Sequence, residues 1–424
     1  MLRFVLRPID DMQIKDLRIA LFNYLVAKQR NKNLLVLIED TDTHKNIEGK
    51  DQEILALLTL FGIKYSQVIH QTQNFRFYSA MALDLLHKKK AFSCFCSSEW
   101  IENKKKEAKK LNKLYSYDDA CRNLPPELVI DNTAPFTIRI ARPDKSITIH
   151  DMLKGDKSFN PDDVDSFVIL HQDKTPTPTF ASAIDSMLND ISIIIREEDY
   201  FNDTAREQHI QEQLGYQKTI KYAHLPSIEN NTIFSNIKLL LEEGFLPTAI
   251  VNYLIFMGNK TPCKIFTLEE ALEWFTLDTI VNSPTSFDLD TLKDINKEHL
   301  RNMDAKELSR YVGFADAEIG ELARIYLKEV STTKELKSKI KPIFSSRNVF
   351  EDFKDEMREM TLCIKKAPYF NEYNDFKNHI MKETKIEGER FEKSLSILLT
   401  NAQDCPDIAK IYTYLKNYIG EIIK

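Results

Sequence analysis

Three cysteines in the first third of the chain have spacing that could build a metal site. Cys94 and Cys96 stand one residue apart, and Cys121 follows 25 residues after Cys96. Three thiolates supply most of a tetrahedral zinc shell, which then needs a fourth ligand. Because six cysteines in 424 residues favour a reducing compartment over a disulfide framework, the trio is either a zinc site or a packed thiol cluster.

A second group of polar residues directly follows a short buried strand. Residues 34–38 are five consecutive apolar residues, which is typical of a strand buried on both faces, and they run into Glu39-Asp40-Thr41-Asp42. An apolar run at 2–6 and a helical pattern over 17–28 precede them. Strand, loop, helix and strand make a βαβ unit, in which ligands bind beyond the carboxyl ends of the strands. We therefore expect loop 7–16 and the acidic loop 39–42 to border one crevice.

The first 42 residues resemble the opening of bacterial glutamyl-tRNA synthetases, which are class I enzymes. The residues that carry the resemblance are Arg3-Phe4, Pro8, Met12, Ile14, Leu17-Arg18, Ala20 to Tyr24 and Ile38 to Asp42. The resemblance continues through most of the chain. It implies an α/β fold with a Rossmann-type parallel sheet, an inserted acceptor-binding subdomain and an all-α C-terminal region of the anticodon-binding type. It also implies a ligase that uses ATP, glutamate and tRNA.

The family's first ATP signature is degenerate in this chain. The resemblance aligns Arg7 with a serine, Ile9 with a threonine and Asp10 with a glycine, while Gln13 replaces a histidine and Lys15 a second glycine. A carboxylate at position 10 repels a triphosphate, and a glutamine lacks the charge of an imidazolium. Lys15 places a long side chain where the resemblance puts the adenine. A subfamily that uses this loop differently is the alternative.

The second ATP signature is also missing. In the family it is a mobile loop whose lysines neutralise the leaving pyrophosphate. Here Tyr222 to Pro226 matches the lead-in, but Ser227 to Asn236 contains no lysine or arginine. The family pattern resumes at 240–247, which implies a deletion of about a dozen residues. Two degenerate signatures at one site predict that adenylation is lost and that ATP does not bind productively.

The amino-acid side of the same site is partly retained. By resemblance, Arg3, Glu39 and Arg196 are glutamate contacts, and the guanidinium fork of Arg196 suits a carboxylate. The three could equally be inherited ion pairs. By the same resemblance Asp199 lies on the nucleotide side, while Pro178 replaces a tyrosine that holds the substrate.

The resemblance also gives an interpretation of the segment around the cysteines. It names Tyr117 as the fourth ligand of the Cys94, Cys96 and Cys121 site. The lysine-rich run 104–110 is either a phosphate-contacting helix or, more commonly, a solvated face. Strand patterns at 136–140 and 147–150 fit the acceptor-binding insertion, and 165–170 is expected to return the chain to the main sheet.

The predicted boundaries follow these matches. They are 1–92 for the first half of the catalytic domain, 93–164 for the inserted subdomain, 165–238 for the second half, 239–302 for a stem-contact region and 303–424 for the helical domain. The pattern of the last region predicts helices throughout. Its final helix should carry a single apolar stripe from Ile408 to Ile422.

Composition narrows the functional classes only slightly. The formal net charge is −6, with 58 basic and 64 acidic residues, so nucleic-acid binding would depend on local basic surface. No apolar run approaches the ~18 residues of a membrane span, and no leader pattern opens the chain, which predicts a cytoplasmic protein without a membrane partner.

Three hypotheses remain from the sequence. The first is a pseudoenzyme, a glutamyl-tRNA synthetase-like protein that binds tRNA, glutamate or a protein partner without adenylation. The second is an active glutamate–tRNA ligase with atypical signatures. The third is an interaction protein on a synthetase scaffold that binds neither tRNA nor glutamate.

Overall fold

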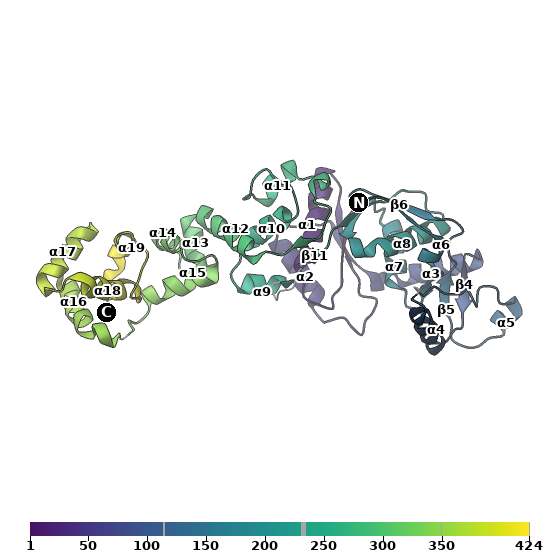
Figure 1. The fold of residues 1–424 in the computed structure, drawn as a ribbon, viewed down its shortest axis with the longest axis horizontal. Coiled ribbons are helices and arrows are strands. Elements are labelled where there is room, and N and C mark those ends of the chain that lie inside the picture. The colour runs from purple at the N-terminus through teal and green to yellow at the C-terminus, as the bar shows by residue number, and fades with distance from the viewer. Residues whose placement is uncertain (113–114, 230–234, 349, 424) are drawn as a thin grey trace. The chain divides into compact units, whose positions relative to one another are not determined.

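The computed structural model describes residues 1–112, 115–229, 235–348 and 350–423 (Figure 1). The chain forms two compact units, one of residues 1–237 with 254–287 and one of residues 238–253 with 288–424. Within the described ranges, no helix is long and apolar enough to cross a membrane.

A seven-stranded sheet organises the first unit. Its order is β3 (Gln67–His70), β2 (Leu34–Ile38), β1 (Leu2–Leu6), β9 (Ile193–Glu197), β10 (Lys221–Leu225), β6 (Ile147–Asp151) and β7 (Gly155–Phe159). All neighbours pair in parallel except β6 and β7, which are antiparallel. The expected βαβ unit is confirmed, because helix α1 (Ile14–Gln29) connects β1 to β2. The sequence patterns did not predict the edge strand β3.

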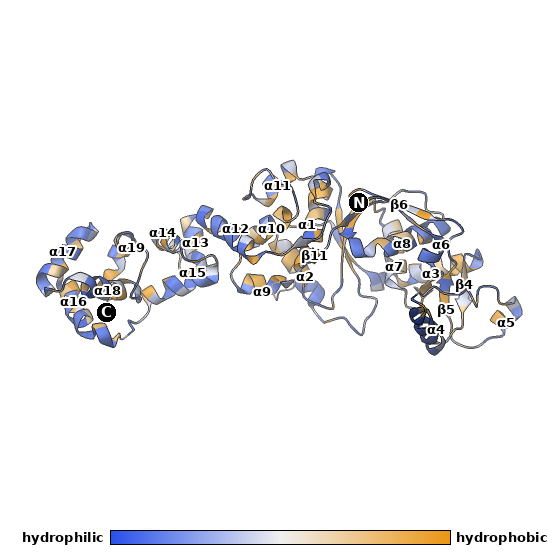
Figure 2. Cartoon of the chain, in the orientation of Figure 1, coloured by the Kyte–Doolittle hydropathy of each residue, from blue (hydrophilic) through white to orange (hydrophobic). Residues whose placement is uncertain are grey.

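Helices complete the core around this sheet. They include α2 (Lys50–Leu60), α3 (Phe75–His87), α7 (Pro178–Leu188) and α8 (Phe201–Gln213). Leu35, Tyr78, Phe180 and Ile210 are fully buried in one cluster that joins strands and helices. Figure 2 shows the central strands in the hydrophobic colour, whereas the lysine-rich α4 (Ser98–Lys110) is hydrophilic.

A smaller antiparallel sheet contains one strand of the inserted segment, β5, and its strand pairing corrects one expectation. Its order is β4 (Ala91–Cys94), β5 (Thr137–Ile140) and β8 (Val168–Leu170). The prediction that residues 165–170 rejoin the main sheet is wrong, because β8 pairs with β5. Instead β6, at 147–151, extends the main sheet through β10. Short helices α5 (Pro126–Ile130) and α6 (Pro161–Val164) connect these strands.

The second unit is helical, as its sequence pattern predicted. The remaining helices and short strands of the chain are β11 (Ile228–Glu229), α9 (Ile237–Glu242), α10 (Pro247–Phe256), α11 (Leu268–Trp274), β12 (Thr285–Ser286), α12 (Leu289–Asn302), α13 (Ala305–Tyr311), α14 (Ala317–Tyr326), α15 (Thr333–Ile340), α16 (Lys354–Lys366), α17 (Tyr373–Thr384), α18 (Gly388–Thr400), α19 (Ile408–Leu415) and α20 (Ile419–Ile422). The expectation of a single final helix is wrong, because a 3₁₀ turn at Lys416–Tyr418 separates α19 from α20.

Candidate active-site cavity and cysteine cluster

A cavity of about 310 Å³ lies in the first unit, bordered by β1, β9 and the loop that leads into α1. Seven carboxylates line it: Asp10, Asp11, Asp16, Glu39, Glu197, Asp203 and Glu207. Four cationic side chains line it as well: Arg3, Arg7, Lys15 and Arg196. The cavity is therefore acidic on balance at the place where parallel α/β sheets bind their ligands.

A buried carboxylate joins the two arginines at the inner end of the cavity. Glu207, on α8, is 1% exposed and Arg3 is 2% exposed. Nη1 of Arg196 donates to Oε1 of Glu207 at 2.9 Å, and Nη2 donates to Oε2 at 3.0 Å. Nη2 of Arg3 lies 3.7 Å from Oε2 of the same carboxylate and donates to the hydroxyl of Ser182 at 2.7 Å. The carboxylate-binding fork of Arg196 is thus occupied by the protein itself.

Arg3, Arg196 and Glu207 shift one another's pKa values through their charges. Burial alone would raise the pKa of Glu207, but the charges of Arg196 and Arg3 outweigh it and lower that pKa. Burial lowers the pKa of Arg3, and Glu207 offsets part of that effect. Burial also acts to lower the pKa of Arg196, but Glu207 outweighs it and the pKa is raised. The lowered pKa keeps Glu207 ionised near neutral pH, and arginine side chains do not lose their proton in proteins.

The acidic loop after β2 is internally paired too. Nε of Arg7 lies 3.1 Å from Oε1 of Glu39. Burial raises the pKa of Glu39, and Arg7 opposes that shift. Asp40 turns away from this contact and accepts hydrogen bonds from the backbone and hydroxyl of Thr72 at 2.9 and 2.8 Å. We expected the loop 39–42 to border the crevice. Of its four residues, Glu39 lines the cavity.

The two degenerate signature positions have clear structural roles at the start of α1. Gln13 is the N-cap residue, its backbone N–H donates to Asp16 Oδ2 at 2.9 Å, and its side chain donates to the carbonyl of Asp11. Nζ of Lys15 lies 3.3 Å from Oε2 of Glu197, at the end of β9. Burial raises the pKa of both Asp16 and Glu197. Lys15 is thus committed to a carboxylate within the cavity.

Asp199 does not line the cavity. It is exposed in the 3₁₀ turn Glu198–Tyr200, whereas Tyr200 and Asp203 contribute to the cavity wall. Oδ1 of Asp203 accepts a hydrogen bond from Thr179 at 3.0 Å. The nucleotide-side role expected for Asp199 remains a prediction, and Asp203 is the aspartate of this segment that lines the cavity.

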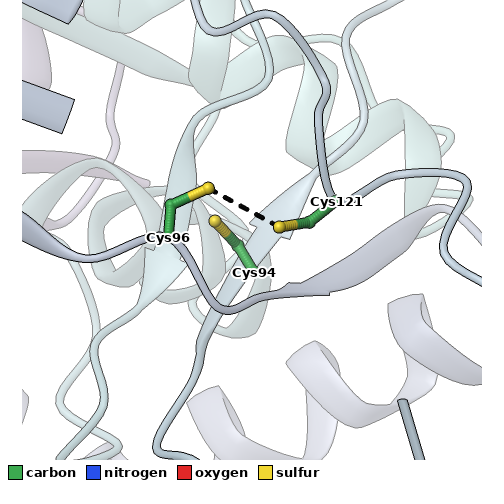
Figure 3. Close-up of side chains that lie close together, drawn as sticks. All are labelled: Cys94, Cys96 and Cys121. Atoms are coloured by element: carbon green, nitrogen blue, oxygen red, sulfur yellow. Dashed lines mark hydrogen bonds between the residues drawn. The ribbon is translucent and has the colours of Figure 1, made fainter. Parts of the chain in front are cut away.

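The three cysteines converge at the end of β4 (Figure 3). Their sulfur atoms lie within 4.8 Å of one another, and Sγ of Cys96 and Cys121 are 3.6 Å apart. The edge of a tetrahedron with zinc–sulfur bonds of about 2.3 Å is ~3.8 Å long. The Tyr117 hydroxyl lies 3.4 Å from Sγ of Cys94 and 3.3 Å from Sγ of Cys96. The four side chains thus have spacing close to that of a zinc shell.

The guanidinium of Arg139 lies beside the cysteine cluster. Nε of Arg139 donates to Sγ of Cys94 at 3.3 Å, and its guanidinium lies 4.0 Å from the centre of the Tyr117 ring. Burial acts to raise the pKa of Cys94, but hydrogen bonds from Tyr117, the Cys96 backbone and Arg139 lower it to about 7. Asp165 accepts the backbone N–H of Tyr117 at 2.9 Å and fixes that loop.

The lysine-rich helix α4 is exposed and only partly self-neutralised. Lys104 pairs with Glu107 at 3.0 Å, and Lys105 pairs with Glu102 at 2.7 Å. Lys106 and Lys109 are exposed and belong to no ion pair within the described ranges. Both sequence interpretations of this run, solvated face and phosphate contact, remain compatible with this arrangement.

Sequence reasoning missed several residues that shape the cavity. Glu207, Arg7 as the partner of Glu39, and Asp203 were not predicted. One signal was present: Thr204, Glu207 and Gln211 follow each other at helical spacing and are all buried. A carboxylate on a buried helix face needs a cationic partner, which points to an arginine on the sheet.

Comparisons with known proteins agree with the class that this fold and cavity define. The family model for class I tRNA synthetases (E and Q), catalytic domain, matches residues 2–294. The chain belongs to this family of class I synthetases, and the fold class expected from the sequence is confirmed.

The similar proteins of known name include several glutamate–tRNA ligases. The chain is 55% identical to Glutamate–tRNA ligase 2 of Sulfurimonas denitrificans and 43% identical to Glutamate–tRNA ligase 1 of Nitratiruptor sp., in each case over 100% of both chains. A crystal structure of a glutamate tRNA ligase from Elizabethkingia meningosepticum in complex with its amino acid matches with a TM-score of 0.82 at 21% identity. That match covers 100% of this chain and 98% of the other.

Proposed function

We propose that this chain is a tRNA-binding member of the glutamyl-tRNA synthetase family that has lost adenylation. The observation that supports it most directly is the acidic cavity. Seven carboxylates and four cations line the crevice, and Lys15 is paired with Glu197. A triphosphate needs positive charge and open backbone N–H groups at such a site, and an excess of carboxylates opposes it.

The size of the rate loss that such substitutions typically cause favours an inactive protein over a slow but ordinary enzyme. Removal of one preorganised charge-stabilising donor typically costs about 10²–10³ in rate. In this chain the histidine position is Gln13, a glycine position is Asp10, and residues 227–236 contain no lysine or arginine. Effects within one site need not add, but several such losses together leave little turnover.

Glutamate is the second ligand to consider, through Arg3, Glu39 and Arg196. Each of these side chains lines the cavity, and each faces an internal counter-ion. A glutamate carboxylate would have to share Arg196 with Glu207, and its ammonium would have to displace Arg7 from Glu39. We therefore propose weak glutamate binding, with tRNA as the principal partner.

Zinc is the proposed structural metal. Cys94, Cys96, Cys121 and Tyr117 would hold it, because their donor atoms already converge at the end of β4. A zinc ion there would cross-link β4 to the loop that carries Tyr117 and Cys121, and its role would be structural because the protein ligands fill all four positions.

An active glutamate–tRNA ligase is the second candidate, and the full-length identity of 55% to a protein of that name favours it. Glutamate-dependent ATP–pyrophosphate exchange, measured with tRNA present, separates the two. We expect no exchange above background. Exchange at a rate near that of an ordinary synthetase would reject the proposed loss of adenylation.

A further inference from the structure

Arg139 is a buried cation beside the cysteine cluster, and its described contacts include no carboxylate. It is 9% exposed. Its Nε donates to Sγ of Cys94 at 3.3 Å, and its Nη1 donates to the carbonyl oxygen of Ser166 at 2.9 Å. Its guanidinium also lies 4.0 Å from the centre of the Tyr117 ring. A buried guanidinium is costly unless a negative charge lies beside it, and among these contacts a thiolate at Cys94 would supply that charge.

A second arginine near the same loop has a different set of partners. Nε of Arg142 lies 3.0 Å from Oδ2 of Asp119, and its Nη1 lies 2.5 Å from Oδ1 of Asp162. Its Nη2 donates to the carbonyl oxygen of Tyr117. In the part of the chain that the structure describes, Arg142 therefore pairs with carboxylates, whereas Arg139 meets a sulfur.

The small sheet places Arg139 on the same side as the cysteines. Arg139 on β5 pairs with Phe92 on β4, and Cys94 follows two residues after Phe92. Because side chains alternate along a strand, Phe92 and Cys94 lie on one face of the sheet together with Arg139. The hydrogen bond to Ser166 then holds the guanidinium in place. These contacts orient Arg139 toward Cys94 without the help of a metal.

We infer that Arg139 is a positioning residue of the proposed zinc site, where its charge offsets that of the shell and its Nε–H orients the sulfur of Cys94. Three thiolates bring more negative charge than a divalent ion neutralises, so the occupied shell is anionic. Hydrogen bonds to ligand atoms from outside the shell orient the ligands and tune the affinity for the metal. This inference rests on the zinc proposal and is independent of adenylation and tRNA binding.

Zinc affinity, measured on the full chain by competition with a chromogenic chelator, gives the first test. Arg139→Gln should lower the affinity about 10- to 100-fold, the usual effect of losing such a contact. Arg139→Lys keeps the charge but not the planar guanidinium, so it should lower the affinity less. Arg142→Gln is the matched control, because it removes an equal charge beside the same loop without touching a sulfur. We expect it to change the affinity less than about fivefold.

Cobalt(II) bound in place of zinc gives a readout that a purely structural role would not move. The energy of the sulfur-to-cobalt charge-transfer band depends on the electron density at the thiolates, which a hydrogen bond to sulfur lowers. Arg139→Gln should therefore shift the band to longer wavelength, and Arg142→Gln should leave it in place. Arg139→Lys should lie between Arg139→Gln and the wild type, and it carries the test if Arg139→Gln does not fold.

The outcomes separate the role of Arg139 from the metal proposal. If the wild type binds zinc and the Arg139 variants match Arg142→Gln in affinity and band position, the role of Arg139 is overturned and the zinc site stands. If the wild type binds no zinc, the metal proposal fails and the inference fails with it. Neither outcome bears on ATP–pyrophosphate exchange, so the proposed loss of adenylation is tested separately.

Discussion

Single side chains decide what this cavity can hold. Glu207 bridges Arg3 and Arg196, the two arginines that the resemblance assigns to the amino acid, and Lys15 bonds Glu197 where the resemblance places adenine. Buried pairs of this kind contribute little net stability, but loss of one partner is costly because the other charge stays buried. The same contacts therefore tie the fold of the cavity to the charges that line it.

Glu207→Gln should destabilise the protein in a pH-dependent way. The pKa of Glu207 is lowered in the folded state, so its contribution is complete above the unfolded value of about 4.3 and is lost as pH falls through the folded pKa. We expect a cost of about 2–4 kcal/mol at pH 7. Thermal melts of both proteins from pH 7 to pH 3.5 should show the gap narrowing at the acid end.

Glu212→Gln is the matched control for this variant, because Glu212 is exposed on the last turn of the same helix. It should change the melting temperature little at any pH. A gap between wild type and Glu207→Gln that stays constant down to pH 3.5 would contradict the assigned ion pair.

The cavity residues also show what sequence could and could not reveal. Arg3, Glu39 and Arg196 were predicted to lie together, and all three line the cavity, because strand ends and the family match placed them. The partner of each depended on how α8 packs on the sheet and how loop 7–13 folds back. Those contacts join residues far apart in the chain, which local patterns do not encode.

At the scale of elements, prediction succeeded where apolar periodicity was strong. Strands β1 and β2 and helix α1 were predicted from such patterns and confirmed. Strand β3, with the sequence Gln-Val-Ile-His, has only two apolar residues and gave no signal. The stripe from Ile408 to Ile422 predicted one helix, but apolar spacing of three or four residues does not distinguish an α-helix from a 3₁₀ turn at 416–418.

The cysteine loop gives a prediction at this scale. Purified protein should contain about one equivalent of zinc, and Cys94→Ser should remove it because a three-ligand set holds the metal weakly. Cys263→Ser should keep it, since Cys263 is exposed and lies outside the cluster. Elemental analysis gives the zinc content and thermal melts give the stability loss. If the native protein contains no zinc, the metal proposal is rejected and the three cysteines are a packed thiol cluster.

At the scale of the whole molecule, the resemblance predicted more than local patterns did. It gave the class I fold, which the family model and the full-length relatives confirm. It did not predict that β6, from the inserted segment, would extend the main sheet, or that β8 would remain in the small one. Strand partners at an insertion depend on packing that a motif match does not describe.

Binding of tRNA is the prediction that involves the whole chain. Because the formal net charge is −6, affinity must come from local basic surfaces, so the protein should shift tRNA in a low-salt gel assay and lose it as salt rises. Lys106→Gln with Lys109→Gln should weaken the shift more than Lys104→Gln with Lys105→Gln. Both double variants remove two charges from α4, but the second pair is already bonded to Glu107 and Glu102. Equal effects would leave α4 as a solvated face, and absence of any shift at low salt would favour an interaction protein that binds neither tRNA nor glutamate.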